Sequence, residues 1–557
     1  MQQVWLKEYP EGVPESIDPN TYNSLVEMIE ESFDKFPKNV AYSNLGVNLT
    51  FAELEEKSRY FASYLQNTLH LKKGARVAIM MPNVLQYPIA LYGILRAGMV
   101  AVNVNPLYTA RELKHQLNDS GAEAMIILAN FAHVLSEVID DTPVRRVIVS
   151  ELGDLCPWPK KTLLNFAVKY IKKMVPKFHL DNHDSIAYVF ARGKQHKLVP
   201  SELGHDDIAF IQYTGGTTGV SKGAVLTHRN MVSNVLQAEA WFKPLVYSSN
   251  EAIITALPLY HIFSLMANCL LYTKLGGENI LITNPRDMPG FVKTLKESRF
   301  TGITGVNTLF NGLLNTPGIE EVDFSNLKMS FAGGMAAQEA VAKAWGELTN
   351  TVLIEGYGLT ETSPAAVVNP MDIDHFSGCI GVPIPSTDVC IRDAEGNELG
   401  FDEAGEVCIK GPQVMRGYWQ RPEETAKVLD DDGWFATGDI GIMNSKGFVK
   451  LVDRKKDMIL VSGFNVYPNE LEDVIMAHPD VLEVAAIGVP DERSGEVVKI
   501  FVVPKSPDLT KESVKDFCAK NLTGYKRPKH IAFLDELPKS NVGKVLRKDL
   551  RTLESET

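Results

Sequence analysis

Residues 213–223 bring glycines, hydroxyls and a lysine together in one short run, Tyr-Thr-Gly-Gly-Thr-Thr-Gly-Val-Ser-Lys-Gly. Glycines let backbone N–H groups approach an anion closely, threonine hydroxyls add hydrogen-bond donors, and Lys222 adds positive charge. The run therefore predicts a loop that binds phosphate groups; the alternative is a glycine-rich turn with incidental threonines. The chain has no Gly-x-x-x-x-Gly-Lys followed by Ser or Thr, which argues against a motor-type NTPase.

Such a loop needs a rigid base, and the flanking sequence predicts one. A strand-like run at 208–212 precedes the loop, and similar short apolar runs alternate with helix-like segments along the chain. These apolar runs lie at 76–81, 124–128, 144–149 and 252–256. The alternation predicts an α/β fold with parallel sheets covered on both faces. One helix is expected at 51–65, with Thr50 as its N-cap.

The texture of the sequence changes twice towards the C-terminus. After Gly378, short strands separated by turn residues predict a small β-rich unit at about 379–453. From Arg454 onward the pattern is compact and of α+β type, with helices expected at 468–477 and 511–520 and strands at 481–489 and 497–503. We place a boundary at Asp453, between a large domain of residues 1–453 and a C-terminal domain of residues 454–557. Acidic and basic residues balance in the latter, so the net charge of −13 lies on the large domain.

Composition excludes several classes of protein. A chain of 557 residues with 45% apolar and 22% charged residues is typical of a compact globular protein with several folded units. The net charge of −13 argues against a DNA- or RNA-binding protein. Six scattered cysteines without a Cys-x-x-Cys pair indicate neither a disulfide framework nor a zinc site.

The sequence favours a cytoplasmic location. Its first residues lack the basic start and apolar core of a signal peptide. The longest uncharged apolar stretch, 252–273, contains Pro258, His261 and Asn268, which favours a buried strand, loop and helix over a membrane span.

Taken together with four further motifs, the glycine-rich loop resembles the AMP-binding, acyl-adenylate-forming enzymes, and the resemblance spans about residues 4–550. The four motifs are Glu-Gly-Tyr-Gly-Leu-Thr-Glu at 355–361, Thr-Gly-Asp at 437–439, Asp-Arg at 453–454 and Pro-Lys-Ser-Asn-Val-Gly-Lys at 538–544. Within that superfamily, the block from Asp432 to Leu460 is similar to the signature of the fatty-acyl-CoA synthetases. The resemblance implies a large N-terminal domain, a small mobile C-terminal domain, and a reaction that uses ATP and CoA.

For the nucleotide, the resemblance assigns roles residue by residue. Asp439 would accept the ribose hydroxyls with support from Arg454, Tyr357 would stack on adenine, and Glu361 with Thr214 would hold Mg²⁺. The remaining nucleotide contacts implied are Tyr213, Gly215, Gly216, Thr217, Thr218, Gly219, Lys222, Gly356, Gly358 and Thr360. Taken without the family, Glu361 could equally be an acid at a helix N-terminus, Tyr357 a core residue and Arg454 a surface ion-pair partner.

Lys544 is the expected catalytic cation, because a carboxylate and a triphosphate must be brought together by positive charge. Taken alone, Lys544 could be a solvated surface lysine. His261, in Leu-Pro-Leu-Tyr-His-Ile-Phe at 257–263, would border the carboxylate end of the acyl pocket, although a buried, hydrogen-bonded histidine is the simpler interpretation. Gly463 would line the passage of the CoA arm, and Asp453 would be the hinge of the mobile domain.

The function implied is ATP-dependent activation of long-chain fatty acids to acyl-CoA through acyl-AMP, feeding fatty acid degradation. The alternatives are a medium-chain, aryl or carrier-protein ligase, or a catalytically idle nucleotide-binding protein of the same fold. Partners are thus a long-chain fatty acid, ATP and CoA, and a homodimer stays compatible with the sequence.

One segment bears on location. Residues 160–177 carry six lysines and no acid, with apolar residues at helical spacing. This pattern suits binding to an anionic membrane surface, and peripheral association with the inner face of the cell membrane is the matching expectation. An ordinary surface helix with its apolar side in the core explains the same pattern.

Overall fold

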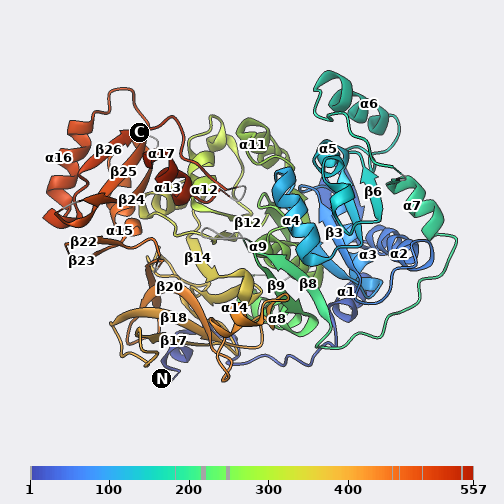
Figure 1. The fold of residues 1–557 in the computed structure, drawn as a ribbon, viewed down its shortest axis with the longest axis horizontal. Helices are drawn as coiled ribbons and strands as arrows, with labels where there is room; N and C mark the ends of the chain where they lie inside the picture. The colour runs from blue at the N-terminus through green and yellow to red at the C-terminus, as the bar shows by residue number, and fades with distance from the viewer. Residues whose placement is uncertain are drawn as a thin grey trace.

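The protein is described here by a computed structural model that covers residues 3–181, 183–214, 221–245, 251–454, 456–462, 464–491, 493–540 and 543–555. Its strands form two large sheets in the N-terminal body, a small sheet beside them and a separate sheet in the C-terminal part, as far as these residues show. Figure 1 shows the C-terminal part in red at one end of the body, with helix α6 (Lys160–Phe166) projecting at the opposite end.

One large sheet has the strand order β16-β15-β14-β13-β12-β10-β11-β1-β2. Its strands are β16 (Val382–Pro383), β15 (Ala365–Val368), β14 (Leu353–Gly358), β13 (Met329–Ala332), β12 (Gly302–Gly305), β10 (Ala252–Thr255), β11 (Glu278–Leu281), β1 (Val40–Asn44) and β2 (Val47–Thr50). Pairing is parallel from β14 through β1 and antiparallel at both edges.

The other large sheet has the order β19-β9-β8-β4-β3-β5-β6-β7. Its strands are β19 (Gly417–Tyr418), β9 (Gly223–Thr227), β8 (Ile208–Tyr213), β4 (Val100–Asn103), β3 (Arg76–Met80), β5 (Ala124–Leu128), β6 (Arg146–Ser150) and β7 (Asp184–Ser185). Strands β3 to β8 pair in parallel, whereas β9 is antiparallel to both β8 and β19. The glycine-rich loop therefore connects two antiparallel neighbours.

The main core lies between these two sheets. Helices α1 (Leu25–Lys35), α2 (Phe51–Asn67), α3 (Gln86–Arg96) and α8 (His228–Phe242) contribute to a single apolar cluster with residues of both sheets. Strand β3 shows why its sequence is apolar throughout. Val77 and Ile79 face this core, whereas Ala78 and Met80 face a second cluster under helix α4 (Ala110–Ser120).

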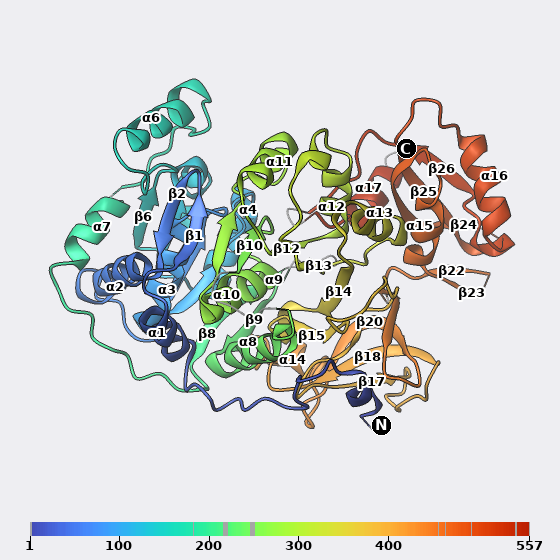
Figure 2. The same ribbon diagram turned by 180° about the vertical axis from the view of Figure 1, so that it is seen from behind.

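The small antiparallel sheet has the order β17-β18-β20-β21, formed by β17 (Asp388–Arg392), β18 (Ala404–Lys410), β20 (Phe435–Met443) and β21 (Val449–Arg454). The N-terminal segment runs along it, where the Gln3 amide donates to Asp388 and the Tyr9 hydroxyl donates to the Pro383 carbonyl. Figure 2 shows this segment passing below β17. Residues 3–24 thereby tie the small sheet to the body.

The C-terminal part builds its own apolar clusters, which contain only residues from 459 to 550. Its sheet contains β22 (Ile459–Val461), β23 (Phe464–Val466), β24 (Val481–Asp491), β25 (Gly495–Pro504) and β26 (His530–Phe533). Helices α15 (Pro468–Met476), α16 (Lys511–Asn521) and α17 (Arg547–Ser555) accompany it. The boundary at Asp453 thus falls within the last residues of β21 and not in a separate linker.

The elements expected from the sequence are present. Helix α2 begins at Phe51, and Thr50 caps it by accepting a hydrogen bond from the Glu53 N–H. The expected strands at 76–81, 124–128, 144–149 and 252–256 correspond to β3, β5, β6 and β10, with ends that match or differ by at most two residues. The stretch at 252–273 is a strand followed by a helical segment, and no helix in the described ranges has the length and hydropathy needed to cross a membrane.

Candidate active site

Asp439 is the centre of a polar cluster formed by three of the expected nucleotide-binding residues. The Tyr357 hydroxyl donates a hydrogen bond to Asp439 Oδ2 at 2.6 Å. Arg454 Nε lies 3.5 Å from Asp439 Oδ1. A carboxylate has about four acceptor positions, so these two contacts leave capacity for further donors such as ribose hydroxyls.

Strand register explains this cluster. Asp439 on β20 and Arg454 on β21 are direct partners across the antiparallel pair, which places their side chains side by side. Tyr357 lies on β14 of the large sheet. Burial, and then the charge of Asp439, raise the pKa of Tyr357 well above its usual value, so its hydroxyl stays a donor.

Glu361 lies in a short 3-10 turn, Thr360–Thr362, directly after β14. Its side chain is buried, and the Tyr418 hydroxyl donates to its Oε1 at 2.7 Å. Burial raises the pKa of Glu361, whereas the Tyr418 hydrogen bond lowers it. A buried carboxyl group with a raised pKa gains from a nearby cation.

The donor types of Glu361 and Thr214 fit the ligand preference of a magnesium ion. Over the described ranges, no three His, Cys, Asp or Glu side chains converge on one point, so a cage made only of such side chains is absent there. Magnesium usually takes one or two protein carboxylates and completes its shell with water and phosphate oxygens. One carboxylate from Glu361 and one hydroxyl from Thr214 match that preference.

The base of the glycine-rich loop continues the β8–β9 hairpin. The Thr214 N–H donates to the Lys222 carbonyl at 2.9 Å, and the Ser221 hydroxyl donates to the Thr214 carbonyl at 2.6 Å. The expected phosphate-binding residues Gly215, Gly216, Thr217, Thr218 and Gly219 lie outside the described residues, as does Gly463. What the structure places is therefore Tyr213, Thr214 and Lys222 at the two ends of the loop.

Three side chains that the sequence did not single out support this region: Tyr418, Glu424 and Asp119. Lys222 Nζ lies 2.6 Å from Glu424 Oε2 and 5.0 Å from the centre of the Tyr418 ring. Lys222 and then Lys427 lower the pKa of Glu424 to about 2, so that carboxylate stays charged.

Asp119 joins the loop to the segment that carries Tyr418. Its Oδ2 accepts from the Tyr213 hydroxyl at 2.7 Å, and its Oδ1 accepts from Arg421 at 2.7 Å. The Trp419 backbone N–H donates to the Gly223 carbonyl, which closes the same connection. The mixture of aromatic and charged residues at 417–424 is a sequence signal that could have pointed to Tyr418 and Glu424, whereas no such signal marks Asp119.

Lys544 reaches this cluster from the C-terminal part. It is half-buried, and burial, then the charge of Arg454, lower its pKa to about 7, whereas Asp439 raises it. Thr308 on α12 (Asn307–Leu314) holds the preceding residue, because its hydroxyl donates to the Gly543 carbonyl at 3.0 Å. A Cβ on Gly543 would lie 2.6 Å from that hydroxyl, and its φ is +79°, so the position requires glycine.

Asp453 connects the body to the C-terminal part through its side chain. It is buried, and its Oδ2 accepts from the Asn469 N–H in the first turn of α15 at 3.0 Å. Burial raises the pKa of Asp453, and the charge of Arg547 opposes that shift. The expected hinge residue is thus also a cap for the first helix of the C-terminal part.

The positive charge of Lys544 acts on His261. Its Nδ1 accepts from the Phe263 N–H at 3.3 Å, which caps helix α9 (Ile262–Ser264). Burial, and then the positive charge of Lys544, lower the pKa of His261 to about 4, so its ring is neutral near pH 7. Both sequence interpretations therefore meet at this residue: it makes a local hydrogen bond, and it lies near the expected catalytic lysine.

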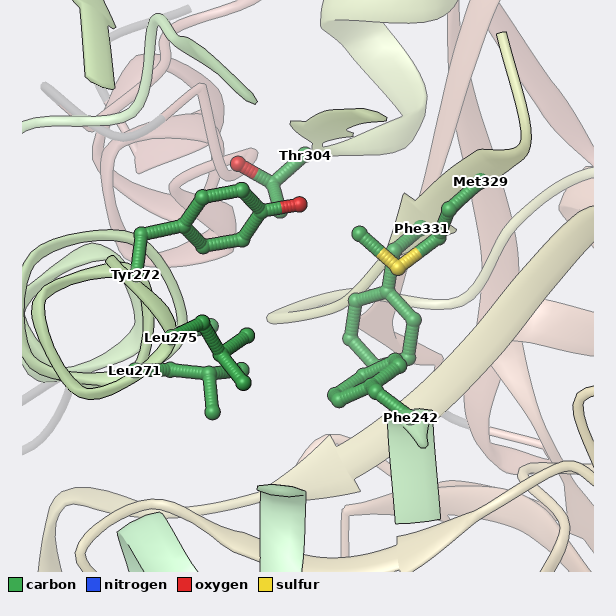
Figure 3. A pocket seen from close by; sticks show the side chains of 8 residues that line it. Phe242, Leu271, Tyr272, Leu275, Thr304, Met329 and Phe331 are labelled. Atoms are coloured by element: carbon green, nitrogen blue, oxygen red, sulfur yellow. The ribbon is translucent and has the colours of Figure 1, made fainter. Parts of the chain in front are cut away.

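Figure 3 shows a small apolar pocket. Its lining comes from α8, from the helical segment at 265–275 and from strands β12 and β13. The lining residues are Phe242, Ala267, Leu271, Tyr272, Leu275, Thr304, Met329 and Phe331. The ring centres of Phe331 and Phe263 are 5.8 Å apart, and a Cβ on Gly356 would lie 2.4 Å from the Phe331 ring. The pocket thus adjoins both the His261 segment and the Tyr357 segment.

Comparison with known proteins identifies the family of the chain that forms this polar cluster. The profile described as AMP-binding enzyme matches residues 29–419, and the profile described as AMP-binding enzyme C-terminal domain matches residues 470–544. The chain belongs to the AMP-binding enzyme family. The long-chain-fatty-acid–CoA ligase of Escherichia coli O157:H7 is 58% identical over 551 residues, which are 99% of this chain and 98% of that protein.

Solved structures that resemble this chain include two forms of one protein. ATP-bound MatB from Rhodopseudomonas palustris is 27% identical and superposes with a TM-score of 0.82, covering 96% of this chain and 99% of that chain. The apo form of MatB, with the same identity and coverage, gives a TM-score of 0.71. The arrangement of this chain is thus closer to that of the ATP-bound structure.

Proposed function

We propose that this AMP-binding enzyme activates long-chain fatty acids to acyl-CoA, with ATP and CoA as co-substrates and acyl-AMP as the intermediate, in support of fatty acid degradation. The observation that carries the proposal is that the segment of Lys544 contacts the body, where the Thr308 hydroxyl donates to the Gly543 carbonyl. The charges of Arg454 and Asp439 also act on the pKa of Lys544. The identity to a long-chain-fatty-acid–CoA ligase over 99% of the chain supports the substrate class.

In the first half-reaction, a carboxylate oxygen of the acid attacks the α-phosphorus of ATP, and pyrophosphate leaves. Both reactants are anions, so the approach needs a cation, and Lys544 is the residue that we assign to it. Tyr357, Asp439 and Arg454 hold the adenosine, while Tyr213, Thr214, Lys222, Gly356, Gly358 and Thr360 complete the nucleotide contacts. Gly215, Gly216, Thr217, Thr218 and Gly219 belong to the same proposal.

Glu361 and Thr214 would hold Mg²⁺, whose positive charge neutralises phosphate oxygens when it is bound. The contribution of the chain itself is orientation. Tyr418 fixes one oxygen of Glu361, and Asp119 fixes the segment that carries Tyr418. The proposed site therefore also depends on Tyr418 and Asp119, which act by positioning other side chains.

In the second half-reaction, the CoA thiolate attacks the acyl carbon, and AMP leaves. Lys544 occupies the same region as the first step requires, so the C-terminal part must move before CoA can enter. We assign the rotation to Asp453 and the passage of the CoA arm to Gly463. The domain division at 453 is part of this proposal.

The acyl chain would widen and enter the small apolar pocket that adjoins the His261 segment, where each buried methylene contributes about 0.8 kcal/mol. His261 is assigned a place at the carboxylate end of that chain. We also propose that the enzyme works at the anionic inner face of the cell membrane, where its substrate dissolves; a homodimer stays a prediction from the sequence.

The test is AMP release measured with ATP, CoA and a series of acids of different chain length. We expect AMP release only when all three substrates are present, with the highest kcat/KM for long-chain acids. A maximum at medium-chain or aryl acids would favour the neighbouring ligase activities. Absence of acid-dependent AMP release would instead support an idle nucleotide-binding protein.

A further inference from the structure

The segment at 157–177 exposes more large apolar side chains than any other described part of the chain. Trp158 is 84% exposed, Leu163 66% and Ile171 67%. Phe166, Tyr170 and Met174 are also exposed. Such side chains occur singly elsewhere on folded surfaces, so a group of this size marks an interaction site.

The segment is an ordered projection of the body. Helix α6 continues into a π-helical turn, Ala167–Ile171, and the pair projects from the body at the end far from the C-terminal part (Figures 1 and 2). The Asn165 amide donates to Glu151 at 2.9 Å, the Asn130 amide donates to the Met174 carbonyl at 3.0 Å, and Val168 is buried. One side is therefore anchored while the other faces solvent.

The same segment is strongly basic in an acidic protein. Lys160, Lys169, Lys172, Lys173 and Lys177 are exposed, and Lys161 pairs with Asp154 at 2.9 Å. Because the whole chain carries a net charge of −13, this basic surface is a local feature.

We propose that the surface formed by residues 157–177, the docking surface from here on, binds the anionic lipid surface of a membrane. The inference deepens the proposed function, on which its choice of a lipid surface partly rests. Apolar side chains would enter the boundary between headgroups and acyl chains, and the surrounding lysines would contact anionic headgroups. Trp158 and Tyr170 suit that boundary, because each has an apolar ring and a polar group.

Charge argues against a second copy of the chain as the occupant. A twofold interface through this surface would place the same lysines of both copies against each other, and like charges at close range repel. An anionic bilayer offers both the apolar layer and the opposite charge. Leu45 extends the apolar area, since it is exposed and its carbonyl accepts from Lys160.

The first experiment is co-sedimentation of the full-length protein with vesicles of phosphatidylcholine alone or mixed with phosphatidylglycerol. The variant K169E/K172E/K173E should bind the mixed vesicles roughly a hundredfold more weakly, at about 1 kcal/mol per lysine near the surface. The matched control K511E/K515E/K520E makes the same change on exposed lysines of α16 and should bind like the wild type. Equal binding by the first variant and the wild type would overturn the proposal.

The second experiment tests the apolar contact. The variant L163S/F166S/I171S should lose binding to the mixed vesicles, and lipids with brominated acyl chains should quench a fluorescence component that disappears in W158F. Absence of that quenching would overturn insertion of the docking surface. Dimers of the wild type that these serine substitutions dissociate, without any vesicle binding, would assign the surface to a second copy instead.

Activity separates this proposal from the proposed function. With acid dispersed in detergent, all these variants should keep wild-type AMP release, because none of the substituted residues belongs to the active site. A wild-type protein that binds vesicles but releases no AMP would contradict the proposed function and leave the docking surface intact. A fully active protein that does not bind vesicles would contradict the docking surface and leave the proposed function intact.

Discussion

The nucleotide end and the apolar pocket of the proposed site are built on different principles. At the nucleotide end, side chains from β14, β20, β21 and the segment at 417–424 are held by hydrogen bonds to two carboxylates, Asp439 and Glu361. The pocket is lined by aliphatic and aromatic side chains from α8, the helical segment at 265–275, β12 and β13, and Phe331 separates it from the nucleotide motif.

In the proposed function, this difference separates the steps that each region would control. Hydrogen bonds and charges fix the geometry of the phosphate chemistry, which is the same for every acid. Apolar packing fixes how much of an acyl chain can be buried. Changes at the nucleotide end should therefore slow all acids alike, whereas changes in the pocket should alter the ranking of acids.

Lys544→Ala should have the largest effect. Loss of the cation should slow acyl-AMP formation by about 10² to 10³, because an electrostatic contact made in the transition state is removed. Pyrophosphate exchange measures this step, and CoA transfer to purified acyl-AMP measures the other. Equal slowing of both half-reactions would contradict the assigned role, and a loss that depended on acyl chain length would contradict the separation of the two regions.

Asp453→Pro should leave acyl-AMP formation intact and slow CoA transfer on the order of a hundredfold. Proline fixes φ and restricts the rotation that CoA entry requires. The control is Asp453→Ala, which also loses the hydrogen bond from Asn469 but keeps backbone freedom. Similar behaviour of both variants would show that the side-chain contact, and not rotation, is what matters.

ATP binding should depend on pH through Lys544. The pKa of Lys544 is lowered to about 7, so the side chain loses its proton as pH rises above 7. A bound triphosphate favours the ammonium form, so ATP binding above pH 7 should take up a proton, and the apparent Kd should rise by up to about tenfold per pH unit. Calorimetry in buffers of different ionisation enthalpy measures the uptake, which Lys544→Gln should abolish.

Tyr418→Phe should reduce acyl-AMP formation about tenfold, because one hydrogen bond to the Glu361 carboxylate is lost. The loss should be largest at limiting Mg²⁺ and should be similar for short and long acids. A matched control is Tyr188→Phe, at an exposed tyrosine of helix α7 (Ile186–Gly193). If the effect of Tyr418→Phe did not depend on the Mg²⁺ concentration, Tyr418 would have only a structural role.

Met329→Ala should have the smallest effect and a different character. Enlarging the pocket should raise kcat/KM for longer acids relative to shorter ones by about fourfold per added methylene, as about 0.8 kcal/mol of burial predicts. Met80→Ala, at a buried methionine of β3 in another apolar cluster, is the control for stability alone. An unchanged ranking of acids in Met329→Ala would remove this pocket from the acyl site.

Much of the fold followed from the sequence, because its signals are local. Alternating apolar runs and Thr50 as a cap were enough to predict β3, β5, β10 and α2. The C-terminal helices and strands were predictable for the same reason. The start of β6 was predicted two residues too early, because Val144 is buried without belonging to the strand.

Only those site residues that belong to the family motifs could be predicted from the sequence. Tyr357, Asp439 and Arg454 do lie together, as their motifs implied. Asp119 could not have been found, because its role depends on a contact with Arg421 across 302 positions of sequence. The exposure of the segment at 157–177 was also undecided, since an apolar helical stripe can face either the core or the surroundings.

The register of β20 and β21 has a consequence for product release. Arg454 follows Asp453 directly, so a change of the Asp453 torsion angles necessarily reorients the guanidinium beside Asp439. Any rotation of the C-terminal part about Asp453 would therefore change the contact between Arg454 and Asp439. The proposed binding of the ribose would change with it. One movement of the C-terminal part would then both release AMP and open the site to the CoA thiol.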